Sequence, residues 1–406
     1  MQYINKNKRK SRFFLRFFFI LILLLIISLP FILRLLWHIT ETRELNIFIL
    51  DKTVINQQYQ EHISFNWVLK NEKYVKPDGE FYLPGKDYFG FFPDGDGGYS
   101  FKDLEKKDST DLYRLAENYD MAYYTDLYGV YYAEWISEYP HLAPEEELTP
   151  GERSRLIYGG MTQNDLDFLK LMKEQNKLII NEFNIIASPT SHNIRKQYEE
   201  EFNISWTGWV GRYFEDLDTV TNKELPPWLV NNYIRDNNND WPFSKSGIAL
   251  VSNDGKVVIL EDQTHLNHEV PVIVTSDYYA DHYNVAKQVK YPFWFDICVS
   301  GDENEVVSYY EIDVNSVGDS IVSQWNIPEK FPAVIRHKDA YTYYYFAGDF
   351  ADNPISLNTV KFKHVHNFSF LFYTSEIIER DSFFWRFYRP ILIKILDEYY
   401  NNLQKK

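Results

Sequence analysis

Cysteine is almost absent from this chain, which has one, Cys298, among 406 residues. A single thiol excludes an internal disulfide framework and a zinc site built from several cysteines. The sequence also lacks the glycine patterns of the P-loop and of the dinucleotide-binding turn, and it has no Gly-x-Ser-x-Gly nucleophile elbow. We therefore expect no bound cofactor and no metal, and the sequence identifies no catalytic residue.

Positive charge is scarce relative to negative charge. The chain has 42 Lys and Arg against 58 Asp and Glu, a net charge of -16. Such a surface repels nucleic acid, so we expect no nucleic-acid partner. The hydrophobic fraction of 45% is that of a folded chain, long enough for one large domain or two of ordinary size. The 18% of aromatic residues fits either a biased composition or sugar recognition.

The long apolar run of this chain lies near the N-terminus. Basic residues precede an uncharged stretch from Phe17 to Leu33, which Arg16 and Arg34 bracket. Because arginine side chains extend toward the lipid headgroups, residues 13–37 can cross a hydrocarbon core of about 30 Å. The basic residues 1–12 should remain in the cytoplasm. The sequence thus predicts a single-pass protein of the cytoplasmic (inner) membrane, with the bulk of the chain outside.

A cleaved signal peptide is the alternative for this segment. Cleavage needs a small-residue site of the Ala-x-Ala type after the apolar run. The run ends instead in bulky residues, from Leu29-Pro30-Phe31 to Leu36-Trp37. Pro30 is compatible with a lipid-buried helix. We therefore favour an uncleaved anchor.

Strands and helices are expected to alternate between residues 45 and 260. Strands are predicted at 45–50, 89–92, 119–124, 156–160 and 177–183, and helices at 61–74, 112–118, from 163 and 188–202. Thr162 with Asp165 has the spacing of a capping box, and Ser188-Pro189 has the residue types of a helix start. This alternation predicts an α/β fold with a mostly parallel, doubly wound sheet.

The second half of the chain has a different pattern. Asn253-Asp254-Gly255 between two apolar runs predicts a β-hairpin. Later β-like runs at 270–274, 305–312, 333–336 and 341–346 predict that residues 261–375 form an antiparallel β-rich extension or a subdomain. Residues 381–404 predict an amphipathic aromatic helix, which either packs on the domain or lies at the bilayer surface. We favour packing.

Polar side chains follow two of the predicted parallel strands. Because ligands of open α/β sheets bind beyond the carboxyl ends of the strands, we expect these side chains to line one crevice. Capping or turn formation would explain each of them structurally, except the glutamate, which ends an otherwise apolar strand. The candidates for ligand binding are Asp126, Tyr128, Glu182, Asn184, Ser188 and Thr190.

Aromatic segments supply further binding candidates. Residues 206–213 include Trp209 and Arg212, residues 291–296 are similar, and residues 343–352 end in Asp349 and Asp352. Aromatic rings beside carboxylates and arginines suit carbohydrate recognition and core packing equally. Two carboxyl groups could also hydrolyse a glycoside, provided that their separation is suitable.

One segment resembles a known superfamily. The stretch Ile157-Tyr-Gly-Gly-Met-Thr-Gln-Asn-Asp-Leu166, followed by Lys177-Leu-Ile-Ile-Asn-Glu-Phe-Asn184, is similar to a unit of class I glutamine amidotransferase-like domains. That flavodoxin-like α/β superfamily includes the trehalose-utilisation-like proteins and the β-galactosidase trimerisation domain. The resemblance covers about residues 45–260. It is one of pattern, without a diagnostic motif.

The resemblance does not extend to the catalytic elbow. Catalytic members carry a Gly-x-Cys-x-Gly elbow and a later His and Glu. Here Cys298 comes too late in the chain, has no such elbow and has no basic neighbour. The resemblance therefore implies a domain without thiolate chemistry, in which Cys298 is a small buried side chain.

Three functions remain open at this point. The first is a membrane-anchored, extracytoplasmic, non-catalytic amidotransferase-like domain that binds a glycan or a protein partner in cell-envelope or exopolysaccharide processes. The second is a membrane-tethered hydrolase of a sugar or an amide, using Glu182, Asp126 or the Asp349/Asp352 pair. The third is a structural subunit of a membrane complex.

Overall fold

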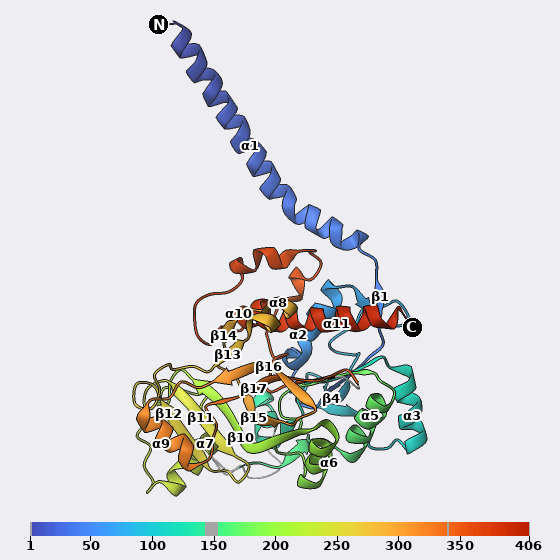
Figure 1. Cartoon of the computed structure of the whole chain (residues 1–406), viewed down its shortest axis with the longest axis vertical. Helices are drawn as coiled ribbons and strands as arrows, with labels where there is room; N and C mark the ends of the chain where they lie inside the picture. The colour runs from blue at the N-terminus through green and yellow to red at the C-terminus, as the bar shows by residue number, and fades with distance from the viewer. Residues whose placement is uncertain (1, 143–152, 339–340, 406) are drawn as a thin grey trace.

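A long N-terminal helix projects from a folded domain in the computed structural model, which describes residues 2–142, 153–338 and 341–405 (Figure 1). Helix α1 (Gln2–Ile39) contains a stretch, Leu15–Ile39, that is long and apolar enough to cross a membrane. Its last turns contact the domain, where Trp37 is only 3% exposed. The segment that follows α1 is also fixed to the domain, because the N–H of Arg43 donates to the carbonyl of Lys73 at 2.8 Å.

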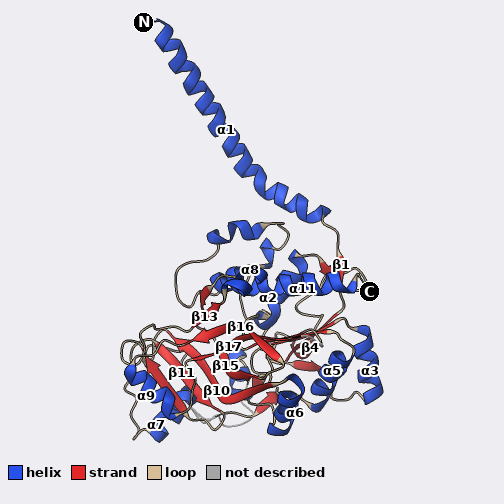
Figure 2. Ribbon diagram, viewed as in Figure 1, coloured by secondary structure: helices blue, strands red, loops and turns tan. Residues whose placement is uncertain are grey.

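The main sheet has ten strands, in the order β14-β13-β16-β17-β18-β9-β6-β2-β4-β5. Figure 2 shows the strands in red, with helices such as α2 (Gln60–Asn71) and α11 (Arg389–Leu403) on one side and α3 (Ser109–Asn118), α5 (Gln163–Glu174) and α6 (His192–Phe202) on the other. The central strands β18, β9, β6, β2 and β4 pair in parallel, and the strands at both edges pair antiparallel. Their bounds are β2 (Ile47–Asp51), β4 (Phe89–Pro93), β5 (Tyr99–Lys102), β6 (Met121–Tyr124), β9 (Leu178–Asn181), β13 (Val272–Thr275), β14 (Gln288–Lys290), β16 (Asn304–Glu311), β17 (Lys330–His337) and β18 (Tyr343–Phe346).

The parallel strands have the order 2-1-3-4-5 when they are numbered along the chain, which is the order of flavodoxin-like folds. All residues of β2, β6 and β9 are buried, as expected for strands covered on both faces. The predicted parallel sheet is thus the centre of a larger mixed sheet. The predicted strand 156–160 lies outside it, because β8 (Leu156–Tyr158) pairs with β7 (Val130–Tyr131) in a separate ribbon.

Neighbouring tyrosines of β6 show how helices cover both faces of this sheet. The ring of Tyr123 stacks on Phe65 of α2 (Gln60–Asn71), with ring centroids 3.9 Å apart. The hydroxyl of Tyr124 donates instead to the carbonyl of Asp165 in α5 (Gln163–Glu174), at 2.9 Å. Successive side chains of a strand point to opposite faces, so α2 and α5 lie on opposite sides. Helix α3 (Ser109–Asn118) packs beside α5.

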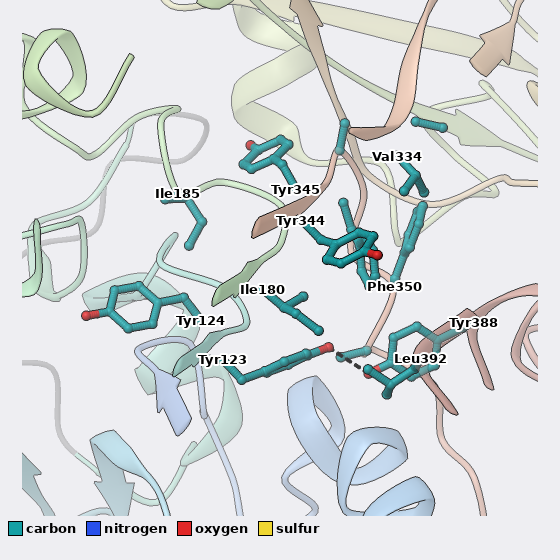
Figure 3. Close-up of a cluster of buried hydrophobic side chains, with 14 of the residues drawn as sticks. Tyr123, Tyr124, Ile180, Ile185, Val334, Tyr344, Tyr345, Phe350, Tyr388 and Leu392 are labelled. Carbon is teal, nitrogen blue, oxygen red and sulfur yellow. Dashed lines mark hydrogen bonds between the residues drawn. The ribbon is translucent and has the colours of Figure 1, made fainter. Parts of the chain in front are cut away.

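The C-terminal helical segment packs beside α2. It consists of α10 (Asp381–Phe383), a π-helical turn (Phe384–Tyr388) and α11 (Arg389–Leu403). The hydroxyls of Tyr388 and Tyr123 are 2.6 Å apart in the buried cluster of Figure 3. Leu392 is fully buried in the same cluster. Of the two arrangements expected for residues 381–404, packing on the domain is the one observed.

A second, antiparallel sheet has the order β12-β11-β10-β15. Its strands are β10 (Ile204–Phe214), β11 (Gly247–Ser252), β12 (Val257–Glu261) and β15 (Phe295–Ser300). The hairpin predicted around Asn253-Asp254-Gly255 joins β11 to β12. Helix α7 (Pro227–Asp236) covers this sheet. The sheets do not divide at residue 260, because β15 joins earlier strands and β18 lies parallel to β9.

The sequence predicts two helix starts between residues 160 and 190, and the structure confirms one of them. Thr162 and Asp165 form the predicted capping box of α5. Helix α6 (His192–Phe202) begins after Ser191, whose side chain accepts a hydrogen bond from the N–H of Ile194. The predicted start at Ser188-Pro189 is therefore wrong.

The other elements are β1 (Arg43–Glu44), β3 (Tyr74–Val75), α4 (Tyr132–Glu138), α8 (Asp277–Tyr283), α9 (Ser316–Gln324), η1 (Leu357–Thr359) and η2 (Val365–Leu371).

Candidate functional site

A cavity of about 300 Å³ lies at the carboxyl ends of the central parallel strands. The connections that leave β2 and β6 run to opposite sides of the sheet, so the space between these two strand ends is a topological switch point. Thr53 follows β2, Asp126 follows β6, and both side chains line the cavity. The antiparallel sheet and α7 form the opposite wall. The cavity thus lies where open α/β sheets usually bind their ligands.

Carboxyl groups are concentrated on the main-sheet side of the cavity. Glu61, in the first turn of α2, lines it together with Asp126. The Oδ1 atom of Asp126 accepts a hydrogen bond from the N–H of Tyr128 at 2.7 Å. Burial raises the pKa of Asp126 well above its usual value, and the charges of Asp51 and Asp352 raise it further. The pKa of Glu61 is raised for the same reasons, so both groups tend to retain a proton.

The segment after β18 adds two more carboxyl groups, Asp349 and Asp352. Asp352 is held on both sides: its Oδ2 atom is 2.5 Å from Nη1 of Arg380, and its Oδ1 accepts from Nε2 of Gln60 at 2.5 Å. Burial raises the pKa of Asp349, and the adjacent charge of Asp352 raises it further. The pair therefore consists of an ion-paired carboxylate and a neighbour that favours its neutral, hydrogen-bond-donating form.

Tryptophans and arginines form the rest of the lining. Trp206, Trp228 and Trp294 come from β10, α7 and the segment before β15, and each is partly exposed. The carbonyl of Trp294 accepts from the N–H of Asp349 at 3.2 Å, so this tryptophan lies beside an acidic residue. The guanidinium of Arg212 is 5.9 Å from the ring of Trp294, and its Nη2 atom donates to Glu224 at 2.9 Å. Arg153 lies 5.9 Å from the ring of Trp228, so the cavity combines flat aromatic surface, cations and acidic groups.

The structure brings together six of the nine binding residues predicted from the sequence. Trp209 is buried at the contact with Trp325, with ring centroids 6.3 Å apart, and lines a different hollow. The hydroxyl of Thr190 donates to the carbonyl of Ile185 at 2.9 Å and accepts from the N–H of Met161 at 2.9 Å, away from the cavity. The six predicted residues that line the cavity are Asp126, Tyr128, Asn184, Ser188, Arg212 and Asp349.

Glu182 lies behind the cavity and does not line it. Its side chain is 1% exposed, its Oε2 atom accepts from the N–H of Ala351 at 2.9 Å, and its Oε1 accepts from the hydroxyl of Tyr123. Burial raises the pKa of Glu182 to about 8. Its position is consistent with a structural role, because both oxygens have partners within the protein.

No helix N-terminus lies at Ser188 to offer its N–H groups to a ligand in the cavity. Because α6 begins at His192, the N–H groups of its first turn belong to a later part of the chain. Ser188 lines the cavity from a loop, where its Oγ atom accepts from Nη1 of Arg153 at 3.3 Å. The cations of the cavity are therefore arginine side chains.

Cys298 lies outside the cavity, within β15. It is 1% exposed, and burial raises the pKa of its thiol well above the usual value. Asp296, two residues earlier, accepts from the hydroxyl of Tyr345 at 2.5 Å and from the N–H of Asn184 at 3.0 Å. The thiol thus belongs to a buried polar network behind the cavity, where the neutral form is favoured.

Several cavity residues escaped the prediction from sequence. Thr53 and Glu61 follow the first parallel strand, β2, and the strand-end rule applied to that strand would have identified them. Trp228 comes from α7, which covers the second sheet, and Arg153 comes from a loop. No local pattern in the sequence indicated either residue. Within the described ranges, no group of three or more His, Cys, Asp or Glu side chains is placed to hold a metal ion.

Comparison with solved structures finds chains of similar outline, among them two ThuA-like proteins. A ThuA-like protein from Bacteroides uniformis has a TM-score of 0.38 and 9% identity, over 88% of this chain and 91% of that one. A ThuA-like protein from Parabacteroides merdae has a TM-score of 0.32 and 10% identity, over 76% of this chain and 79% of that one. No protein-family model matches the chain, and no curated protein matches its sequence.

Proposed function

We propose that this protein is a membrane-tethered carbohydrate-binding protein whose cavity holds a neutral sugar. One observation carries the proposal: three tryptophans and a group of carboxyl side chains line the same cavity of about 300 Å³. Aromatic faces pack on the C–H faces of a sugar ring, while carboxyl and guanidinium groups bond to its hydroxyls. Pockets with apolar walls and a few converging polar groups are the usual form of small-molecule sites.

The charge of the cavity favours a neutral ligand over an anionic one. Glu61, Asp126 and Asp349 lie on one side, and burial raises the pKa of each carboxyl group. Burial and neighbouring carboxylates oppose the negative charge of Glu61 and Asp126, and they would oppose the charge of an anionic ligand at the same place in the same way. A neutral polyol can accept hydrogen bonds from the protonated acids and donate to Asp352. The volume, near the lower end of the usual range of about 300–1,000 Å³, suits one or two sugar units.

The anchor is part of the same proposal. The indole Nε1 of Trp37 donates to the carbonyl of Asn71 at 3.2 Å, and its ring stacks on Phe81 with centroids 5.7 Å apart. These contacts join the end of α1 to the domain, which supports a retained helix. With α1 in the cytoplasmic membrane and the basic N-terminus inside, the cavity would face the cell envelope and its glycans.

Hydrolysis is the second candidate, and the raised pKa of the carboxyl groups favours it. Asp349, Asp126 and Glu61 tend to hold a proton that a general acid would deliver to a leaving group. Asp352, the neighbour of Asp349, is already paired with Arg380 and accepts from Gln60, so its carboxylate is engaged within the protein and is a poor candidate for the second carboxyl group of a glycosidase pair.

The binding proposal is tested by titrating the full chain, in detergent micelles, with a panel of neutral mono- and disaccharides while recording tryptophan fluorescence. We expect Trp294→Ala and Trp228→Ala each to weaken binding by tenfold or more, because each removes an aromatic face. Tyr278→Ala, at a residue 69% exposed on α8, is the matched control and should bind normally. Normal sugar binding by both tryptophan variants would contradict the cavity as the site.

The same samples separate binding from hydrolysis. Asp349→Asn keeps the size and hydrogen-bonding capacity of the side chain but cannot deliver a proton. If the protein releases sugar from a bound disaccharide, this variant should bind and not turn over. If no disaccharide of the panel is cleaved by the unaltered chain, the binding function stands and the hydrolase candidate is rejected for those substrates.

A further inference from the structure

A group of apolar side chains is exposed to solvent on the domain, close to the end of α1. Phe370, Leu371, Phe372 and Ile378 are 63%, 67%, 37% and 45% exposed. We call these residues the 370–378 patch. Large apolar residues at protein surfaces are normally scattered singly, and contiguous groups mark contact with a membrane or another molecule. The patch follows and includes the end of the short helix η2 (Val365–Leu371).

The patch begins at the level where the apolar run of α1 ends. The N–H of Lys363 donates to the carbonyl of Leu33 at 3.1 Å. Leu33 is the last residue of the uncharged run, and Arg34 follows it. The segment around residue 370, orange-red in Figure 1, lies on the side of the domain from which α1 projects. A bilayer that surrounds α1 would therefore have its headgroup region beside this segment.

Charged residues next to the patch match a headgroup region. The ammonium of Lys361 is 5.9 Å from the ring of Trp37, at the end of α1. Nζ of Lys363 is 3.0 Å from Oε2 of Glu72. Lysines and aromatic rings are the side chains that gather where the hydrocarbon core meets water. Lys361 and Lys363 thus lie between the patch and the end of α1, where a headgroup region is expected, although Lys363 is paired with Glu72.

We propose that the 370–378 patch inserts into the interfacial region of the bilayer that α1 crosses, giving the domain a second membrane contact. The proposal rests on the anchor proposed above. The occupant is lipid and not a second copy, because the patch lies on the side of the domain from which α1 projects, and the apolar stretch of α1 has no cover in the structure (Figure 1). The C-terminal helix, the other candidate for contact with the bilayer, has its apolar side in the domain core.

Single thiols placed along the full chain test the proposal. Leu371→Cys reports on the patch, Leu24→Cys on the middle of α1, and Val220→Cys, at a residue 75% exposed away from both, on water. Cys298 is 1% exposed and should not react, which the unaltered chain checks. Each variant is labelled with a polarity-sensitive fluorophore and reconstituted into phosphatidylcholine vesicles that contain lipids with nitroxide on the acyl chain.

We expect strong quenching at positions 24 and 371 and none at 220. If the probe at position 24 is quenched but the probe at position 371 is quenched no more than the probe at position 220, the second contact is overturned and the anchor remains intact. Absence of quenching at both 24 and 371 would contradict the anchor and, with it, the patch. An unquenched but blue-shifted probe at 371, with cross-linking between chains, would assign the patch to a second copy and overturn the proposal.

A charge substitution provides an independent readout. Phe370→Asp combined with Leu371→Asp should at least halve the quenching of a probe placed at Phe372→Cys, because carboxylates resist entry into lipid. Val299→Asp combined with Val317→Asp, at residues each 54% exposed elsewhere, is the matched control and should leave that quenching unchanged. Equal quenching in both double variants would contradict insertion of the patch.

Discussion

Glu182 shows how a single buried carboxyl group is held in this domain. Its oxygens accept from the N–H of Ala351 and from the hydroxyl of Tyr123, which also contacts the hydroxyl of Tyr388. Burial disfavours the ionised form and raises the pKa of Glu182 to about 8, although these hydrogen bonds act in the opposite direction. A neutral carboxylic acid can donate to Tyr123 and still accept from Ala351.

Glu182 should therefore make the stability depend on pH. Because its pKa is higher in the folded chain, about 8, than the usual 4.5, the folded state binds the extra proton between these values. Its contribution is most favourable below about pH 4.5 and is lost as the pH rises to about 8, a change on the order of a few kcal/mol. Glu182→Gln, which keeps both hydrogen bonds, should flatten the dependence of the unfolding free energy on pH.

Urea unfolding of the full chain at pH 5, 6, 7 and 8 measures this effect. Glu200→Gln, at an exposed residue of α6, is the control and should unfold with the pH dependence of the unaltered chain. If Glu182→Gln has the same pH dependence as that control, Glu182 does not hold its proton in the folded state.

At this scale the sequence indicated where the site lies better than which side chains enter it. Asp126 and Asn184 were identified because the strand-end rule needs only the position of a strand end. Glu182 and Thr190 follow the same strand as Asn184, β9, but their side chains point away from the cavity. The chain turns directly after Glu182, with Asn184 in the left-handed region at φ 66°, so the alternation of an extended strand does not continue beyond β9. Tertiary packing sets the path of this turn, and no local pattern in the sequence indicates which of its side chains enter the cavity.

Among the elements, the C-terminal helix makes the most direct contribution to the core. Leu392 of α11 is fully buried in the cluster that contains Tyr123 and Tyr388. We expect Leu392→Ala to lower the free energy of unfolding by about 2–5 kcal/mol, the usual cost of a cavity in a packed core. Ile378→Ala, at a residue 45% exposed, should cost much less. Equilibrium unfolding in urea compares the two variants.

The outcome also distinguishes the two roles that the sequence left open for this helix. A helix lying on the bilayer would lose membrane affinity when Leu392 is shortened, and the domain would keep its stability. Unchanged unfolding with weaker vesicle binding would therefore contradict the packing described above.

Most elements of the α/β part could be predicted, because apolar runs and capping residues are local signals. The hairpin at Asn253-Asp254-Gly255 and the capping box at Thr162 belong to this group. The position of β18 beside β9 could not be predicted from its neighbours along the chain, because the strands that precede it in the sequence are antiparallel. Its residues, Tyr343–Phe346, are all buried, which is the pattern of a strand covered on both faces. Which neighbour such a strand selects depends on the whole sheet.

For the whole molecule, the decisive feature is the joint between α1 and the domain. Trp37 is buried there, with its Nε1 atom bonded to the carbonyl of Asn71 and its ring 4.1 Å from the ammonium of Lys73. We expect Trp37→Ala to release the joint, so that a protease added to the reconstituted full chain cleaves residues 40–45 several-fold faster. Leu35→Ala, at a residue 62% exposed on α1, should be cleaved at the original rate. Equal rates for both variants would mean that Trp37 does not restrain the joint.

The packed joint has a consequence for the reach of the protein. The chain from residue 40 to residue 45 is bonded along its length, since Thr40, Arg43 and Leu45 all donate backbone hydrogen bonds to fixed partners. With α1 in a membrane, as proposed above, the domain would have no slack with which to sample the space above the lipid, and its cavity would stay at one height. Such a protein would engage molecules presented at that fixed distance from the lipid surface, as a spacer selects its partners by length, and would ignore identical molecules held farther out.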